Sequence, residues 1–364
     1  MSHPSFFIVA GEASGDLHGA RLMRSLRDQV PGARFRGHGG DRMVGEGLEL
    51  DQHINQLSIM GFSEVIRKLS FMQEVMKTTV DTLTSNQFDR VILIDYPGFN
   101  LRLAKKISAL NLPVTYFILP QVWAWKENRL RTLASATDQR LSIFPFEQSW
   151  FQERGVAVDY VGHPFADLAP VKIVTDHPPL LTLLPGSRQQ EIDRHWKIFV
   201  RTAEILRRQN EHLAIHVVRF PGLVLDPLPS YFHISSENTL DVLRGSTAAL
   251  VASGTASLEA AVADCPAVVC YRLSGPSWFL AQKLVTVKFA SMVNLIADEA
   301  IVPEFLQYDM EPEKLAAALT PLLEDSGERR VIQAGYRRVR SALGKPGVYD
   351  RAARAIVARM GGTS

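Results

Sequence analysis

The fold is decided by the stretch Ala248-Ala-Leu-Val-Ala-Ser-Gly-Thr-Ala-Ser-Leu-Glu-Ala-Ala261. A short apolar run ends at Ser253-Gly254, and a segment rich in Ala, Leu and Glu follows directly. This pattern predicts a buried parallel strand that passes through a tight turn into a helix. The free N–H groups and the dipole at such a helix start suit a diphosphate, and Glu259, one turn further in, suits a ribose. Plain helix capping fits the same pattern.

Length and composition indicate a globular protein of two domains. The chain has 364 residues, of which 46% are hydrophobic and 21% charged. The formal charge of +2 does not call for a nucleic-acid partner, while a mild basic bias is compatible with an anionic membrane surface or phosphorylated ligands. Cys265 and Cys270 both lie in an apolar run, so we expect reduced core residues rather than a disulfide or a metal pair.

The N-terminus opens directly into the strand-like run 6–10. No basic region or cleavage site precedes this run, and no uncharged apolar stretch in the sequence is long enough to span a bilayer. We therefore expect a protein that stays on the cytoplasmic side.

Strand-like and helical runs alternate in both halves of the chain. The expected strands are 6–10, 33–37, 90–94 and 114–118 in the first half and 180–184, 215–219, 231–234, 267–271 and the apolar run that ends at Ser253-Gly254 in the second. Helical patterns separate many of them, the first near 17–28. This rhythm predicts an α/β fold with a parallel sheet in each half.

The first turn reads Gly11-Glu-Ala-Ser-Gly-Asp-Leu-His-Gly19. Its glycines recur every four residues, which is not the G-x-G-x-x-G spacing of dinucleotide-binding folds, so a nicotinamide-dependent oxidoreductase is disfavoured. Glu12, Ser14 and His18 are candidates to line a ligand cleft. The alternative is a tight turn with Asp16 near the helix start.

A helical pattern over 62–83 places an apolar stripe on one face, formed by Phe62, Val65, Ile66, Leu69, Met72, Met76, Val80 and Leu83. Phe71 and Val75 lie off this stripe, with cations nearby, and they would be exposed if the stripe were buried. An apolar patch with a cationic rim is typical of a surface that rests on anionic lipid. A helix buried all round is the alternative.

The stretch Val91-Ile-Leu-Ile-Asp-Tyr-Pro-Gly-Phe-Asn100 delivers a carboxylate to the end of an apolar strand. Asp95 is a candidate general base with a raised pKa, or else a cap of the following turn. Asn100 is expected to cap a helix that begins near Leu101 and is a candidate ligand group.

Aromatic and cationic residues crowd the segment 121–131. Trp125 and Arg129 are candidates to grip a sugar face and a phosphate, although the indoles could equally be packing residues. His163, beside Pro164, marks the expected exit from the first domain, and its imidazole could still face the cleft.

In the second half, Pro185-Gly-Ser-Arg188 follows the expected strand 180–184 and leads into a helix that starts at Gln189 or Gln190. Ser187 and Gln190 have the spacing of a capping box. Arg188 would project from the helix start, where its guanidinium could neutralise a leaving diphosphate.

Several motifs together resemble the lipid-A-disaccharide synthase family, and they span nearly the whole chain. They are residues 10–16, 39–43, 60–62, 95–100, 121–125, 161–164, 184–188, 253–256 and 303–307. The resemblance implies a GT-B glycosyltransferase fold, with two Rossmann-like domains, a cleft between them and a C-terminal helix that crosses back. The implied domains are 1–165 plus 346–364, which faces the acceptor and membrane, and 166–345, which binds the UDP-sugar.

The resemblance also implies an activity: inverting transfer from UDP-2,3-diacylglucosamine to 2,3-diacylglucosamine 1-phosphate, giving the β-1,6 disaccharide 1-phosphate and UDP. Asp95 would be the general base, and Arg188 would stabilise the leaving diphosphate. The implied donor site is Ser187, Arg188, Ser253, Gly254, Thr255, Ser257, Glu259, Asn294, Glu304 and Gln307, and the acceptor side is Glu12, Ser14, His18, Asn100, Trp125 and Arg129.

The remaining implications concern cofactors and partners. No metal or other cofactor is expected, since no Asp-x-Asp pair presents itself as a metal clamp. The expected partners are the two acylated sugars and the anionic inner face of a Gram-negative inner membrane, with Phe71 and Val75 in contact with lipid. A second copy of the chain, in a homodimer, is a further candidate partner. Two rival functions remain: a UDP-sugar 2-epimerase on the same fold, and a lipid or nucleotide-sugar binding protein without activity.

Overall fold

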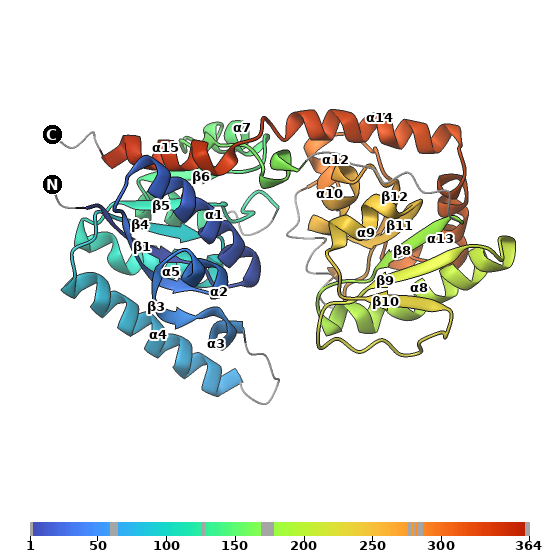
Figure 1. The fold of residues 1–364 in the computed structure, drawn as a ribbon, viewed down its shortest axis with the longest axis horizontal. Helices are drawn as coiled ribbons and strands as arrows, with labels where there is room; N and C mark the ends of the chain where they lie inside the picture. The colour runs from blue at the N-terminus through green and yellow to red at the C-terminus, as the bar shows by residue number, and fades with distance from the viewer. Residues whose placement is uncertain are drawn as a thin grey trace. The chain divides into compact units, whose positions relative to one another are not determined.

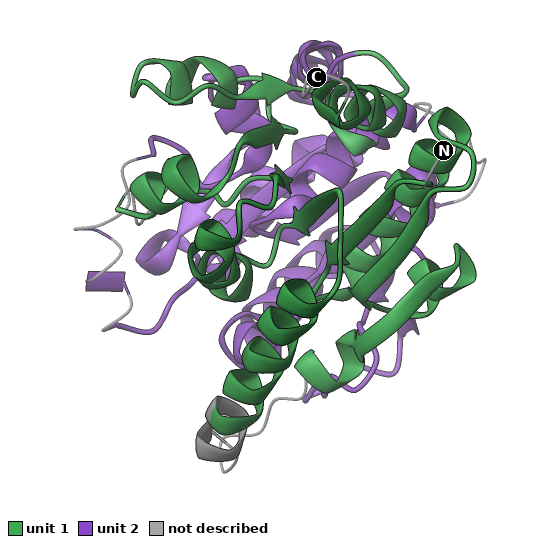
Figure 2. Ribbon diagram, turned by 90° about the vertical axis from the view of Figure 1, so that its left-hand side faces the viewer, with its two compact units in different colours: residues 1–164, 345–364 green, residues 165–344 purple. Residues whose placement is uncertain are grey.

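The computed structural model describes residues 3–58, 65–124, 128–168, 178–275, 278–279, 282 and 287–360. The chain forms two compact units, which Figure 2 shows in different colours. Unit 1 is Met1–Pro164 with Lys345–Ser364, and unit 2 is Phe165–Gly344. Each unit contains one parallel sheet with helices packed against it (Figure 1). No described helix has the length and apolar character needed to cross a bilayer.

The sheet of unit 1 is built around two apolar strands, β1 and β4, which pair with each other in parallel. Among the described residues the strand order is β3 (Leu48–His53), β2 (Arg34–Gly39), β1 (Ser5–Val9), β4 (Arg90–Ile94), β5 (Val114–Phe117), β6 (Gln139–Ser142), β7 (Asp159–Tyr160). Every residue of β4 is buried, as expected for a strand covered on both faces.

The helices of unit 1 are α1 (Ala13–Gln29), α2 (Asp41–Gly45), α3 (Ile54–Ser58), α4 (Val65–Ser85), α5 (Pro97–Ile107), α6 (Arg129–Ala136), α7 (Glu147–Gln152) and α15 (Val348–Met360). Although α15 comes last in the chain, it packs in unit 1. Ser25 Oγ donates to Asp350 Oδ1 over 2.7 Å, and Gln139 Nε2 donates to the carbonyl of Ala355 over 2.8 Å. The expected C-terminal helix that crosses back to the first unit is confirmed.

Unit 2 repeats the strand order of unit 1. Its described strands run β10 (Phe232–Ser235), β9 (Ala214–Val218), β8 (Leu180–Leu184), β11 (Ala248–Ala252), β12 (Ala267–Tyr271), β13 (Glu304–Leu306), all parallel. Its described helices are α8 (Gln189–Gln209), α9 (Thr239–Gly245), α10 (Thr255–Val262), α12 (Met292–Ala297), α13 (Pro312–Leu319) and α14 (Gly327–Ala342). Cys265 and Cys270 are free and buried, as expected.

The expectation that Val75 is exposed on α4 is wrong. Val75 is only 6% exposed and belongs to the core cluster of unit 1, and Phe71 is half-buried and packs against the same cluster. Helix α4 therefore presents a broader apolar face to the core than the single stripe predicted. The motif residues 60–62, with Phe62 of that stripe, lie outside the described residues.

Candidate functional site

The candidate residues of each unit follow the two neighbouring strands at which the strand order reverses. In unit 1, Glu12 follows β1 and Asp95 follows β4; in unit 2, Arg188 follows β8 and Gly254 follows β11. Open parallel sheets bind ligands outside the carboxyl ends of their strands at this switch point, because the loops on either side diverge there. The topology thus gives each unit one place for a ligand.

The chain takes an unusual path at Asp95. Asp95 and Tyr96 have φ angles of 45° and 49°, so two consecutive residues other than glycine adopt the left-handed conformation. Each such residue costs about 1–3 kcal/mol and persists only where its surroundings enforce it, most often at functional sites. Asp95 N–H donates to the carbonyl of Phe117 over 3.0 Å, which extends the pairing of β4 with β5 past the end of the strand.

Two buried side chains hold the Asp95 carbonyl. It accepts hydrogen bonds from Tyr116 Oη and from Asn100 Nδ2, each over 2.7 Å. Asn100 Nδ2 also donates to the carbonyl of Ile94 over 3.2 Å. Within the described residues Asn100 Oδ1 is buried without a partner, which costs about 1–3 kcal/mol, so this amide is oriented by its two donor bonds.

The expected cap role of Asn100 is therefore wrong. Helix α5 begins at Pro97, and Tyr96 is its N-cap residue. Asn100 lies inside the first turn, is fully buried and directs its amide at backbone carbonyls. In this arrangement its side chain is not presented to a ligand.

Gly11 and Tyr96 fit together across the switch point. A Cβ atom on Gly11 would lie 2.2 Å from the Tyr96 ring, so only glycine leaves room for it. The same ring stacks on Phe99, with centroids 5.9 Å apart. The first turn of the chain, at Gly11, thus packs against the Asp95–Tyr96 turn.

Burial, followed by the negative charge of the nearby Glu12 carboxylate, raises the pKa of Asp95 to about 6. A carboxylate with this pKa is largely ionised at neutral pH yet basic enough to accept a proton from a hydroxyl group. Burial also raises the pKa of Tyr116 far above its usual range, so its hydroxyl remains a hydrogen-bond donor.

The other candidates of the first turn have different environments. Glu12 and Ser14 are exposed, whereas His18 is partly buried, and its Nδ1 lies 2.8 Å from Tyr349 Oη of α15. Burial, followed by the charge of Arg21, lowers the pKa of His18 to about 4, so its imidazole is neutral near pH 7. Asp16 is structural, because its carboxylate accepts from the N–H groups of Gly40 and Met43.

The aromatic segment after β5 is only partly described. Trp125 lies outside the described residues, while Arg129 is partly buried at the start of α6. Trp123 is a packing residue, since it is 3% exposed and its Nε1 donates to Glu147 Oε1 over 2.9 Å. His163 is buried, its ring lies tilted against Phe144 with centroids 5.3 Å apart, and burial lowers the pKa of its imidazole to about 3.

At the start of α8 the capping residue differs from the prediction. Arg188 is the N-cap residue, and Glu191 rather than Gln190 reaches back, accepting from the N–H groups of Ser187 (2.9 Å) and Arg188 (3.3 Å). The Arg188 side chain is 66% exposed, and one guanidinium nitrogen lies 3.8 Å from Glu191 Oε1. An exposed guanidinium at a helix start is well placed to meet an anionic ligand.

The strand, turn and helix predicted from the stretch 248–261 are confirmed. Gly254 is the N-cap residue of α10, with φ at 128°, a conformation that favours glycine, and a Cβ added there would meet no atom within 4 Å. Ser257 Oγ donates to the Gly254 carbonyl and Ser253 Oγ to that of Ala290, so both hydroxyls brace the turn. Thr255 is exposed. Burial raises the pKa of Glu259 to about 7.

Three residues of the expected donor site, Asn294, Glu304 and Gln307, are held in hydrogen bonds within the protein. Asn294 Oδ1 accepts from the N–H groups of Ile301 and Val302, and its Nδ2 donates to Glu304 Oε1 over 2.8 Å. The Glu304 carboxylate accepts from the N–H groups of Ala290 and Ser291, just before α12. Gln307 Oε1 accepts from the N–H of Leu273. These side chains brace the segment between β12 and β13.

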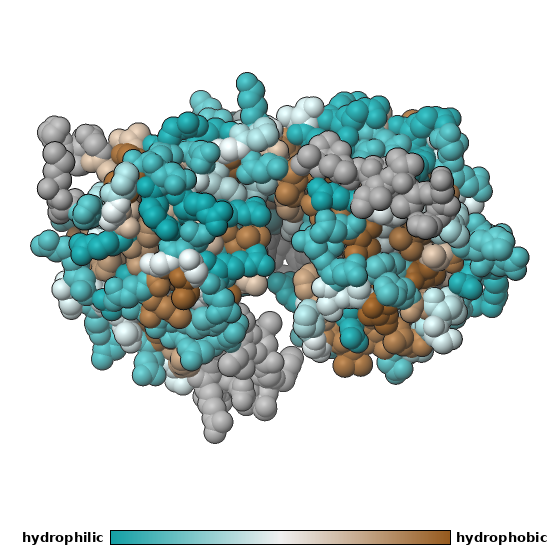
Figure 3. All heavy atoms as spheres, in the orientation of Figure 1, coloured by the Kyte–Doolittle hydropathy of each residue, from teal (hydrophilic) through white to brown (hydrophobic). Residues whose placement is uncertain are grey.

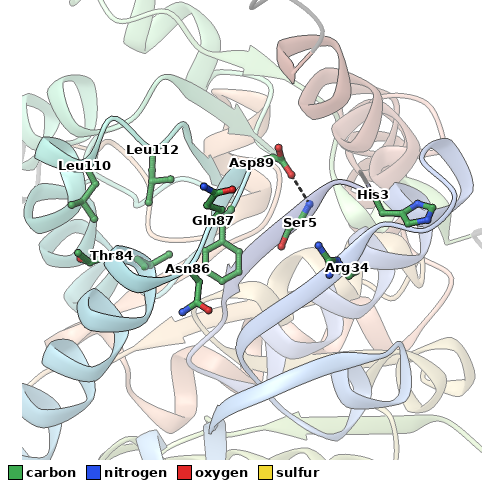
Figure 4. A pocket seen from close by; sticks show the side chains of 11 residues that line it. His3, Ser5, Arg34, Thr84, Asn86, Gln87, Asp89, Leu110 and Leu112 are labelled. Carbon is green, nitrogen blue, oxygen red and sulfur yellow. Dashed lines mark hydrogen bonds between the residues drawn. The ribbon is translucent and has the colours of Figure 1, made fainter. Parts of the chain in front are cut away.

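A cavity of about 470 Å³ in unit 1 lies elsewhere. Figure 4 shows its lining, which includes Ser5, Arg34 and Asp89, with Asp89 Oδ2 accepting from the Ser5 N–H over 2.7 Å. These residues lie where β1, β2 and β4 begin, at the opposite edge of the sheet from Asp95. Within the described ranges, no three His, Cys, Asp or Glu side chains gather as metal ligands.

Three residues of this arrangement are not singled out by the sequence pattern: Tyr116, Tyr96 and Glu191. A tyrosine in a buried strand is the one available signal for Tyr116, because a buried phenol needs a hydrogen-bond partner. Glu191 has N3 spacing from Arg188, but arginine is an unusual N-cap residue.

The fold, with one parallel α/β sheet in each unit, is the GT-B fold of two-domain glycosyltransferases. The calicheamicin glycosyltransferase CalG4 superposes with a TM-score of 0.63 at 16% identity, with 100% of both chains covered. A putative UDP-N-acetylglucosamine 2-epimerase from Listeria monocytogenes gives a TM-score of 0.66 at 11% identity, covering 99% of this chain and 96% of that chain. At these identities the likeness concerns the fold alone.

Sequence comparison identifies the family. The family model described as Lipid-A-disaccharide synthetase matches residues 6–358. The lipid-A-disaccharide synthase of Myxococcus xanthus is 35% identical over 371 residues, covering 97% of both proteins, and that of Alkalilimnicola ehrlichii is 36% identical over 376 residues, covering 98% of both. The chain belongs to the lipid-A-disaccharide synthase family and is a hexosyltransferase.

Proposed function

We propose that this chain joins UDP-2,3-diacylglucosamine to 2,3-diacylglucosamine 1-phosphate by inverting transfer, with Asp95 as general base and Arg188 at the leaving diphosphate. Family membership supports the reaction. The observation that carries the residue assignment is the Asp95 turn, which presents a carboxylate of raised pKa at the switch point of unit 1.

The reaction proceeds in a single displacement. Asp95 accepts the proton of the acceptor 6-hydroxyl as that oxygen attacks C1 of the donor sugar, and the bond from C1 to the diphosphate oxygen breaks. The electron pair leaves with UDP. Positive charge on the sugar and negative charge on the diphosphate both grow in the transition state, so Arg188 and the N-terminus of α10 stabilise it more than they stabilise the substrates.

The donor site is proposed on unit 2. The exposed Arg188 side chain and the open approach to Gly254 support a diphosphate there, with Ser187 and Thr255 nearby in sequence. Glu259, with its pKa raised to about 7, can donate or accept a hydrogen bond to a ribose hydroxyl near neutral pH. Glu12, Ser14, His18 and Arg129 remain the proposed acceptor side.

The test is release of UDP by purified protein, given the diacylated UDP-sugar alone and then with the diacylated sugar 1-phosphate. We expect release only with both, with the disaccharide detected by mass spectrometry. Asp95→Asn should abolish turnover, while the matched exposed change Asp81→Asn on α4 should not. Isomerised donor without acceptor would instead indicate an epimerase, and binding without release would indicate a binding protein.

We also propose that the chain works on the anionic inner face of the inner membrane, because both proposed substrates carry acyl chains. With Val75 buried, the lipid contact needs other residues. Phe220 (50% exposed), Val224 (63%) and Leu228 (47%) follow β9 in unit 2. Figure 3 shows hydrophobic residues along the lower border of that unit, where Figure 1 places the segment between β9 and β10.

This membrane contact is tested by flotation with vesicles that contain anionic phospholipid. The triple change of Phe220, Val224 and Leu228 to Ser should reduce the bound fraction. The change Val331→Ser serves as control, since Val331 is also exposed (68%) but lies on α14. Equal binding of the triple variant and wild type would contradict the assignment.

A further inference from the structure

The Asp95 carbonyl receives two side-chain donors that come from different elements. Tyr116 lies on β5 and is fully buried; Asn100 lies on α5 and is fully buried. Both donate to the same oxygen over 2.7 Å. Both hydrogen bonds are made to Asp95, whose backbone is in the strained left-handed conformation. They therefore stabilise the chain at the residue where the strain lies.

We propose that Tyr116 and Asn100 are positioning residues, which hold the Asp95–Tyr96 turn in its left-handed conformation and so aim the Asp95 carboxylate at the acceptor hydroxyl. This inference rests on the proposed role of Asp95 as base. Neither side chain takes part in the proton transfer, because both are directed at the backbone of Asp95.

A role in packing alone does not explain the hydrogen bonds of Asn100 and Tyr116. If Asn100 served only to fill space, an apolar residue would avoid leaving its Oδ1 buried without a partner. If the Tyr116 hydroxyl served only the packing of the sheet, a partner within its own strand pairing would suffice; instead it reaches past the end of β4. Tyr96 adds a third restraint, with its ring between Gly11 and Phe99.

Tyr116→Phe removes the hydroxyl and keeps the ring. We expect kcat to fall about tenfold, with KM for the donor changed by less than about twofold, because a loosened turn misplaces the base without touching the donor site. We also expect the acidic limb of the pH–rate profile to move to lower pH, because a looser turn admits water to the carboxylate. A purely structural hydroxyl would move neither quantity. Asn100→Ala should act in the same direction.

The matched control is Tyr336→Phe in unit 2. Tyr336 is also fully buried, but it belongs to unit 2 and makes no hydrogen bond to the Asp95 turn, so removal of its hydroxyl should leave kcat and the pH profile unchanged. Wild-type kcat and an unshifted limb in Tyr116→Phe, with Asp95→Asn inactive, would overturn the positioning role and leave the proposed function standing. An active Asp95→Asn would instead overturn the proposed function. If Asn100→Ala does not fold, Tyr116→Phe decides alone.

Discussion

The raised pKa of Asp95 gives the sharpest prediction, which is a loss of activity on mild acidification. A general base works only in its ionised form, so kcat/KM should follow the ionised fraction of Asp95. With the pKa at about 6, that fraction falls from about 0.9 at pH 7 to about 0.1 at pH 5. We therefore expect kcat/KM to drop about tenfold between these two pH values.

The magnitude distinguishes this environment from an ordinary carboxylate. At the ordinary pKa of 3.8, Asp95 would remain about 0.9 ionised at pH 5, and the rate would hardly change. The assay is UDP release with both substrates between pH 4.5 and 8 at constant ionic strength. Circular dichroism at each pH confirms that the protein stays folded.

Two variants test the cause of the shift. Glu12→Gln removes the negative charge that adds to the raised pKa, so the midpoint of the acidic limb should move to lower pH. Glu259→Gln is the necessary control, because the pKa of Glu259 is raised to about 7 and could produce a limb of its own. A limb that disappears in Glu259→Gln, or a flat profile down to pH 5 in the wild type, would refute the assignment to Asp95.

Three further predictions concern single side chains. Gly11→Ala places a Cβ 2.2 Å from the Tyr96 ring and should cost about 1–3 kcal/mol of stability and at least tenfold in kcat; Gly45→Ala, where a Cβ meets nothing within 4 Å, should match the wild type in melting and rate. Arg188→Ala should lower kcat/KM about 100-fold or more in the UDP-release assay, whereas Arg201→Ala, an exposed arginine on the same helix, should have no effect. Burial raises the pKa of Glu147 to about 8, so between about pH 5 and 8 the folded state holds a proton that the unfolded state has lost, and the free energy of unfolding should fall by up to about 1.4 kcal/mol per pH unit. The melting temperature of the Glu147→Gln variant should therefore fall less between pH 6 and pH 8 than the melting temperature of the wild type. Equal falls in the two proteins would show that Glu147 does not titrate in this range.

The strands that the sequence predicts best are the buried apolar ones. The ends of β4, β8 and β12 agree with the expected ranges, because a strand covered on both faces is a continuous apolar run between polar turns. Strands such as β3 were missed. Its residues Glu49 and Asp51 are exposed at the edge of the sheet, so the segment lacks the apolar pattern that identifies central strands.

The errors at helix starts have a common cause. The sequence predicts a helix that begins near Leu101, whereas α5 begins at Pro97, because proline suits the first turn of a helix, where its missing N–H is not needed. At α8 the serine spacing predicted a capping box, but Glu191 supplies the carboxylate. In both cases two neighbouring positions are compatible with a helix start, and packing in the folded protein decides which one is used.

The Asp95 site shows where sequence pattern stops being informative. An apolar strand that ends in a carboxylate is visible in the sequence, so the position of Asp95 at the end of β4 could be predicted. What shapes its environment comes from elsewhere: Tyr116 is 21 positions away in the chain and meets Asp95 because Ile94 pairs with Phe117 in the sheet. A shift of one residue in that register would turn Tyr116 to the other face of the sheet. The strain at Asp95 and the core of unit 1 are therefore coupled through β5, and changes in that strand should alter the rate before they unfold the protein.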